Sequence, residues 1–247
     1  QFNQKFFYPR KTIRIFRSAR EKALWDKKSQ ARPDFLPFVE NNFSATDLPT
    51  PWEAPFGGMT LIHGGWCDTE CLLQTLSKFF KAKKILHLQQ CNHASLSWSD
   101  KSVSWNNEEF DHVIFCEGYQ IRENPFFNSI PFEHVKGETL TLSFNASIPE
   151  NAILNFVKWV IPYPDNTFRC GSTYDWYHLN ETPTADARET ILNALTAHFK
   201  IDPQVKNQQA GVRPVCKDMK PVLGPHPQYP RLWVFNGLGA KGILRAP

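Results

Sequence analysis

The amino-acid sequence predicts an α/β plus α+β fold, with a partial parallel-type sheet in one domain and an antiparallel sheet in the other. Two continuous apolar runs, within 110–119 and 230–237, predict the parallel-type sheet, because strands covered on both faces carry apolar residues at successive positions. Alternation of apolar and polar residues predicts antiparallel strands with one solvent face. The alternating segments are 11–16, 138–144 and 166–174.

A short helix is expected directly after the first alternating strand. Ser18 is followed by Glu21 three positions later, and this capping box is typical of a helix N-terminus. Residues 30–58 are rich in Pro, Asn and Thr, so an irregular connection is expected there. The segment 59–65 predicts a strand that ends at two glycines.

The clearest helix of the sequence is predicted over 67–82, with Asp68 or Thr69 as its N-cap. Its apolar residues recur at helical spacing and share one face. These residues are Leu72, Leu73, Leu76, Phe79 and Phe80. Further strands are predicted at 83–90 and 102–105.

The apolar run at 113–116 ends at Glu117 and Gly118. Ligands of open α/β sheets bind beyond the carboxyl ends of the strands. A ligand is therefore expected around Glu117 to Tyr119.

The second half of the chain contains another strong helix, predicted over 184–199 and packed on the antiparallel sheet. Its apolar positions are Ile191, Leu192, Leu195 and Phe199. Because the two strand types alternate along the chain, we expect two domains built from discontinuous segments. Segments 1–58 and 126–210 would form the antiparallel domain, and segments 59–125 and 211–247 the parallel-type domain.

The composition bears on three questions: nucleic-acid binding, planar-ligand binding and membrane insertion. The 247 residues carry a net charge of +4, which is too weak and too dispersed to indicate a nucleic-acid partner. Aromatic residues make up 14% of the chain, which indicates either a Phe-rich core or a pocket for a planar ligand. The sequence contains no apolar run that approaches the length of a transmembrane span.

The six cysteines form no C-x-x-C pair. Buried free thiols in a reducing, cytoplasmic compartment are expected rather than a disulfide framework. His87, Cys91 and His93 lie close together in the sequence, but their spacing matches no zinc pattern, so no metal site is predicted.

A G-x-G-x-x-G motif follows the last apolar run, at Gly237, Gly239 and Gly242. This spacing is found where a turn carries a dinucleotide pyrophosphate. It is equally typical of a tight strand-to-helix turn. In either case, glycines let a ligand approach the backbone closely.

Several motifs together resemble the D-amino-acid oxidase-like FAD-dependent oxidoreductases, the group of glycine oxidase and sarcosine oxidase. In chain order these motifs are GGWCDTECLLQTL, VIFCEGYQIRENPFF, FEHVKGETLTL, WVIPYPDNTFRCGSTYDW and GVRPVCKDMKPVLGPHPQYPRLWVFNGLGAKGILRAP. The resemblance covers nearly the whole chain. It implies that the antiparallel domain binds substrate and that the parallel-type domain is a partial FAD-binding domain.

The resemblance also implies where FAD would lie. The glycine turn would lie under the flavin ring, with the start of its helix toward the pyrimidine side, and the end of the 110–119 strand would contact the cofactor. The implied cofactor-binding residues are Glu117, Gly118, Gly237, Leu238, Gly239, Ala240, Lys241 and Gly242. The family's pyrophosphate fingerprint lies in an N-terminal βαβ unit that this sequence lacks. We therefore expect an internal piece of a longer flavoenzyme that does not retain FAD tightly by itself, with an unpaired position beside the strand at 111–117.

Three residues are expected to contribute to catalysis. Arg213 matches the family's arginine that pairs with a substrate carboxylate, which a planar guanidinium binds bidentately; a structural ion pair with Asp218 or a surface charge is the alternative. Trp159 stands where family members often place a tyrosine. Lys241 would stabilise reduced flavin or assist oxygen, unless it is an exposed lysine without a role.

The implied function is oxidation of a small-molecule amine or amino acid to an imine by hydride transfer to the flavin. One alternative is a FAD-dependent tRNA-modification enzyme domain, which would need a basic face. A truncated, cofactor-free fragment without activity of its own is another.

Overall fold

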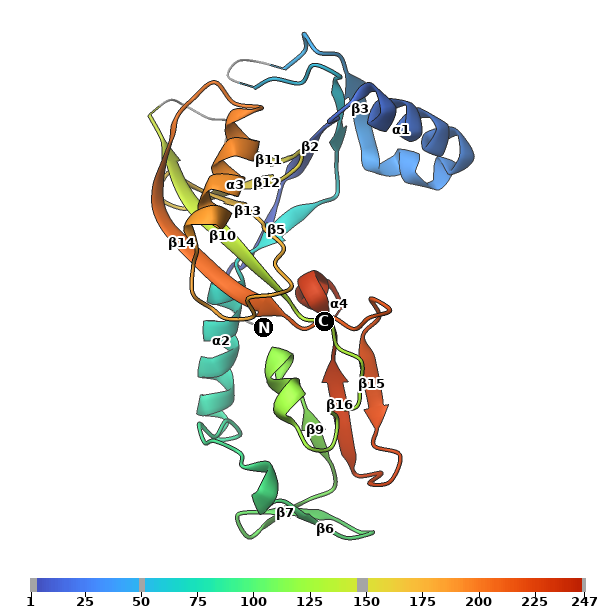
Figure 1. Cartoon of the computed structure of the whole chain (residues 1–247), viewed down its shortest axis with the longest axis vertical. Helices are drawn as coiled ribbons and strands as arrows, with labels where there is room; N and C mark the ends of the chain where they lie inside the picture. Colours follow the sequence, from blue (N-terminus) through green and yellow to red (C-terminus); the bar gives the residue numbers. More distant parts are fainter. Residues whose placement is uncertain (1–3, 49–51, 146–150, 246–247) are drawn as a thin grey trace. The chain divides into compact units, whose positions relative to one another are not determined.

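The computed structural model describes residues 4–48, 52–145 and 151–245 of the chain (Figure 1). The chain divides into two compact units, each assembled from separate segments. The first unit contains Gln1–Thr75, Glu138–Thr173 and Thr182–Ala210, and the second unit contains Leu76–Gly137, Tyr174–Glu181 and Gly211–Pro247. The assignment of the predicted segments to a substrate domain and a FAD domain stays a prediction.

A mixed sheet forms the framework of the first unit. Among the described residues it has eight strands in the order β14-β10-β13-β12-β11-β2-β4-β3. Their bounds in chain order are β2 (Lys11–Ile15), β3 (Val39–Phe43), β4 (Gly58–Leu61), β10 (Val135–Phe144), β11 (Ala152–Asn155), β12 (Trp159–Tyr163), β13 (Thr167–Gly171) and β14 (Pro203–Arg213). The strands predicted at 11–16, 138–144 and 166–174 are confirmed as β2, β10 and β13. A smaller pair, β1 (Phe7–Pro9) and β5 (Gly65–Cys67), is antiparallel.

Helix α3 (Ala185–Thr196) covers this sheet in the core of the first unit (Figure 1). The Thr184 side chain caps it by accepting a hydrogen bond from the Ala187 backbone N–H. Ile191 and Leu195 are completely buried, and they belong to one cluster with Leu140 and Phe168 of the sheet. The predicted helix and its packing on the sheet are therefore confirmed over Ala185–Thr196, but Phe199 lies beyond the helix, where it is buried in the same cluster and bridges to Trp52.

Helix α1 (Ala19–Ala31) begins at the predicted capping box. Ser18 accepts a hydrogen bond from the Glu21 backbone N–H, and the Glu21 carboxylate accepts from the backbone and side chain of Arg17 and from the side chain of Arg14. Burial alone would raise the pKa of Glu21, but these bonds lower it from 4.5 to about 2. The 3₁₀ helix η1 (Pro33–Phe38) follows α1 and leads into β3.

The second unit has a small sheet of mixed direction. In the described residues its order is β15 (Val222–Pro225), β16 (Leu232–Asn236), β9 (Val113–Phe115), with β15 antiparallel and β9 parallel to β16. Three side chains of this sheet, Phe115, Leu232 and Val234, form one core with Leu96, Val103, Ile121 and Phe127. The other elements are η2 (His93–Ser95), the antiparallel strands β6 (Ser97–Trp98), β7 (Val103–Trp105) and β8 (Glu108–Phe110), then η3 (Gly118–Glu123), η4 (Gly239–Lys241) and α4 (Gly242–Arg245). Helix α2 (Thr69–Ala82), capped by Asp68 as predicted, runs from the first unit into the second.

Some predictions are wrong. Residues 85–90 form no strand, because no other described segment pairs with them. The strand predicted at 59–65 exists in part as β4, but it pairs antiparallel with β2 and β3 and is not a parallel-type strand. β9 is not covered on both faces: it is an edge strand within the described residues, and Ile114 is 56% exposed.

The cysteines are also less buried than predicted. All six lie in the described part of the chain as free thiols, but only Cys170 and Cys216 are buried. Cys91 and Cys116 are exposed, and Cys67 and Cys71 are half-buried.

Truncation of Leu195 tests the core of the first unit. Leu195→Ala should lower the free energy of unfolding by about 2–5 kcal/mol, because it leaves a cavity between α3 and the sheet. Urea unfolding followed by circular dichroism measures this change. The exposed Asn193→Ala on the same helix is the matched control, and equal stability losses in the two variants would contradict the described packing.

Glu21 tests the start of α1. Its folded pKa lies below the unfolded value, so its stabilisation is present above pH 4.5 and is lost as the pH falls toward 2. Glu21→Gln should lower the free energy of unfolding near neutral pH by about 1–2 kcal/mol, since solvent screens part of the interaction. The difference between wild type and variant should shrink on acidification below about pH 5. A difference that stays constant down to pH 3 would argue against these hydrogen bonds.

Candidate active site

The carboxyl ends of β9 and β16 are joined by one side chain. Asn236, which ends β16, is buried, and its amide Nδ2 donates a hydrogen bond of 2.9 Å to the Gly118 carbonyl beyond β9. The Asn236 Oδ1 accepts from the Gly237 backbone N–H at 2.8 Å. Both parallel strands therefore end at one edge, the position at which α/β sheets bind ligands.

The glycine motif forms a tight turn at this edge. Gly237 and Gly239 have positive φ angles of 72° and 59°, which glycine adopts without strain. A Cβ at Gly237 would lie 2.5 Å from the Cys216 Sγ, so this position is also closed by packing. Gly118 differs, because no described atom lies within 4 Å of a Cβ placed there. The backbone at Gly118 is therefore accessible to a ligand.

A carboxylate network fixes the end of β9. The Glu117 carboxylate contacts the His93 Nε2 at 2.6 Å and accepts a hydrogen bond of 2.8 Å from the Asn124 amide. Asn124 is completely buried, and its Oδ1 caps the backbone N–H groups of Phe126 and Phe127. Cys116 is exposed as a residue, but partial desolvation of its sulfur, together with the Glu117 charge, raises the pKa of the thiol. The Glu117 carboxylate is thus held in place by His93 and Asn124.

Arg213 lies at the end of β14, and its guanidinium lies close to the Tyr174 ring and to the backbone of Gly137. Its Cζ lies 4.9 Å from the centre of the Tyr174 ring, a cation–π contact. On another side is Gly137, where a Cβ would lie only 2.0–2.2 Å from guanidinium atoms. Burial lowers the pKa of Arg213. These contacts determine where the guanidinium lies.

Backbone hydrogen bonds connect Arg213 to the glycine turn. The next residue, Pro214, accepts a hydrogen bond of 2.8 Å from the Gly239 N–H, and Val215 forms a bridge with Leu238. On its other side, the Val215 carbonyl accepts a hydrogen bond of 2.7 Å from the Glu133 N–H. The arginine and the turn therefore belong to one hydrogen-bonded framework.

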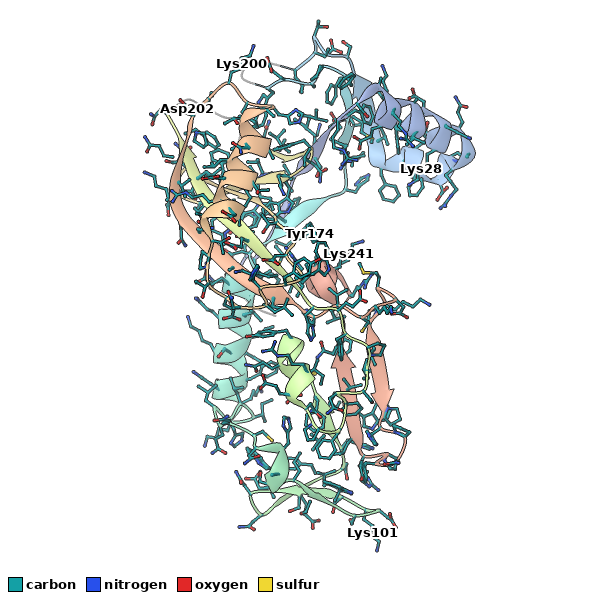
Figure 2. The ribbon with its side chains drawn as sticks, viewed as in Figure 1. Lys28, Lys101, Tyr174, Lys200, Asp202 and Lys241 are labelled. Atoms are coloured by element: carbon teal, nitrogen blue, oxygen red, sulfur yellow. The ribbon has the colours of Figure 1, made fainter. Side chains whose placement is uncertain are left out.

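The structure brings most predicted site residues into the second unit. Arg213 and all the implied cofactor-binding residues belong to it; these are Glu117, Gly118, Gly237, Leu238, Gly239, Ala240, Lys241 and Gly242. Lys241 is exposed, in η4, and Figure 2 labels it with Tyr174 at the same end of the second unit. Trp159 lies in the first unit on β12, paired with Gly171 of β13.

Sequence reasoning missed Gly137, Tyr174, Asn124 and Asn236. Only Gly137 had a usable signal, because a glycine inside an alternating strand indicates close approach of another group. Nothing in the local sequence of Tyr174 or Asn236 distinguishes it from an ordinary surface or strand residue.

Metal-binding clusters and membrane-spanning helices are both absent from residues 4–48, 52–145 and 151–245. No cluster of three or more His, Cys, Asp and Glu side chains there could hold a metal ion. None of the helices in these ranges has both the length and the apolarity needed to cross a membrane.

A family model described as "DAO: FAD dependent oxidoreductase" matches residues 4–247. Glycine oxidase of Bacillus subtilis is 27% identical over 184 residues, which cover 69% of this chain and 46% of that protein. The tRNA 5-methylaminomethyl-2-thiouridine biosynthesis bifunctional protein MnmC of Vibrio cholerae is 22% identical over 268 residues, with 92% of this chain and 40% of that protein covered. The chain thus spans less than half the length of these two relatives.

A solved structure is similar in fold. Glycine oxidase from Geobacillus kaustophilus superposes with a TM-score of 0.80 at 16% identity, covering 96% of this chain and 68% of that one. At this identity the likeness establishes the fold alone.

Asn236 tests the edge of the second unit. Asn236→Ala would remove the donor to the Gly118 carbonyl and the acceptor for the Gly237 N–H. We expect the free energy of unfolding to fall by about 1–3 kcal/mol, because both backbone groups lose a partner. Urea unfolding measures the loss, with Asn193→Ala as the control. A neutral Asn236→Ala variant would show that the amide does not hold the two strand ends together.

Proposed function

Because the chain belongs to the DAO family of FAD-dependent oxidoreductases, we propose that it oxidises an amine or amino acid to an imine. The observation that carries the proposal is the location of Arg213. It is a half-buried guanidinium on the same backbone framework as the glycine turn. This arrangement supports a site that holds a carboxylate near a bound cofactor.

We propose that the open edge of the second unit holds the flavin end of FAD. When bound, FAD supplies the ring that accepts a hydride from the substrate. The residues fit this role, since Gly118 and Gly239 have no side chain that would block the approach of a ligand to the backbone, and Gly239 holds its positive φ without strain. Asn236 would keep the two strand ends at a fixed spacing while the cofactor is held.

Arg213 would orient the substrate. A guanidinium binds a carboxylate through two parallel N–H···O bonds, and this fixes the direction of the α-carbon. Positioning of this kind needs no proton transfer from the arginine, which stays charged. Trp159, through its indole N–H, and Lys241, through its exposed ammonium, remain proposed contributors to substrate and flavin binding.

A second candidate is the oxidation of an amine carried on a tRNA nucleoside. The MnmC relative covers 92% of this chain, whereas the glycine oxidase relative covers 69%. Helix α1 also presents basic side chains to solvent; these are Arg20, Lys22, Lys27 and Lys28, the last labelled in Figure 2. Binding of tRNA that weakens steeply with salt would favour this candidate over a free small molecule.

A cytoplasmic location is proposed as well. All six cysteines of the chain are free thiols, which suits a reducing compartment.

Arg213→Ala tests the proposed function. With FAD in excess and an artificial electron acceptor, KM for a carboxylate-bearing amine such as sarcosine should rise roughly 10- to 150-fold, because a charge-assisted pair is worth about 1.5–3 kcal/mol. Arg213→Lys should recover part of the loss. Methylamine, which has no carboxylate, serves as the control substrate and should respond little to either change. An unchanged KM for every carboxylate-bearing substrate would remove Arg213 from the site.

A further inference from the structure

The segment that follows β13 exposes three aromatic side chains. Tyr174, Trp176 and Tyr177 are 58%, 55% and 89% exposed. The rings of Tyr174 and Trp176 are nearly parallel, with centroids 6.0 Å apart and an interplanar angle of 22°. Exposed aromatic clusters of this kind mark binding surfaces more often than scattered apolar residues do.

This aromatic loop (Tyr174–Tyr177) is held firmly by polar contacts. The Asp175 Oδ1 accepts hydrogen bonds from the Tyr177 and His178 backbone N–H groups, at 2.8 and 3.1 Å. The backbone of Asp175 also pairs in both directions with that of Lys136, a buried residue of β10. The aromatic rings are therefore presented to solvent by an ordered backbone, at little further entropic cost on binding.

The same loop reaches the arginine that we assign to the substrate carboxylate. One face of the Tyr174 ring receives the Arg213 guanidinium at 4.9 Å. Next to Tyr174, Trp176 offers an aromatic surface for a second planar group. A cation and a flat apolar surface thus lie together in the second unit.

We propose that the aromatic loop is a stacking platform for a planar ring of the substrate. The substrate class would be an amine that carries both a carboxylate and an aromatic or heteroaromatic ring. Arg213 would bind the carboxylate, and Trp176, with Tyr177, would contact the ring. The inference rests on the proposed function of Arg213 and narrows its substrate class. A free aromatic amino acid and a base of a modified nucleoside share this chemistry.

Calorimetric titration of the FAD-loaded protein tests the platform with probes that have no amine to oxidise. Phenylacetate has ring and carboxylate, acetate has the carboxylate alone, and benzyl alcohol has the ring alone. We expect phenylacetate to bind about tenfold more tightly than acetate, as one stacked ring contributes. Trp176→Ala should abolish this preference and leave acetate affinity unchanged, whereas Trp176→Phe should keep most of it. Phe38→Ala, an exposed aromatic residue of the first unit, is the matched control and should change neither affinity.

Three outcomes would overturn the platform. They are equal affinity for phenylacetate and acetate in the wild type, a preference that survives Trp176→Ala, and no binding of any probe. Benzyl alcohol separates this inference from the proposed function. If it binds in a Trp176-dependent manner while acetate does not bind, the platform stands and the carboxylate role of Arg213 falls. To distinguish the two sources of the ring, the same titration compares phenylacetate with orotate, which carries a carboxylate on a uracil ring and has no amine to oxidise; tighter binding of orotate would favour a nucleoside base, and tighter binding of phenylacetate an aromatic amino acid.

Discussion

The candidate site depends on the hydrogen bond from the Gly239 N–H to the Pro214 carbonyl. This bond of 2.8 Å ties the glycine turn after β16 to the residue that follows Arg213. In the same segment, the Val215 carbonyl accepts a hydrogen bond from the Glu133 backbone N–H. A flexible charged side chain thereby gains a fixed origin relative to the turn, and the contacts of its guanidinium with Gly137 and Tyr174 set its direction. Positioned charge of this kind is what an oxidoreductase needs to orient a carboxylate.

Elements whose signal is local could be predicted from the sequence. The Ser18 cap and the apolar register of Ile191 and Leu195 depend only on residues within one helix, and the structure confirms both. The prediction of a strand at 83–90 was wrong because a strand needs a neighbouring strand for its backbone hydrogen bonds. Whether a distant segment supplies that partner cannot be seen in the local sequence. Ile114 shows the same limit, since a continuous apolar run does not reveal whether both faces are covered.

The site divides in the same way. The glycine turn was visible as a motif, and Arg213 was identified through the resemblance to a family. The residues that hold the turn and the arginine in place could not be predicted from the sequence. Asn236 contacts Gly118, and Tyr174 contacts Arg213, only after segments distant in sequence come together. Gly137 is intermediate, since its missing side chain hinted at a close neighbour without saying that the neighbour is a guanidinium.

The claim that Arg213 holds a carboxylate beside the bound flavin is tested most directly by the visible absorption of the FAD-loaded protein during titration with acetate. A carboxylate bound next to the ring changes its electrostatic surroundings, so the flavin bands of the wild type should shift in a saturable manner. Arg213→Ala should show no such shift at the same acetate concentrations. A saturable shift of equal size in Arg213→Ala, or none in the wild type, would contradict the account.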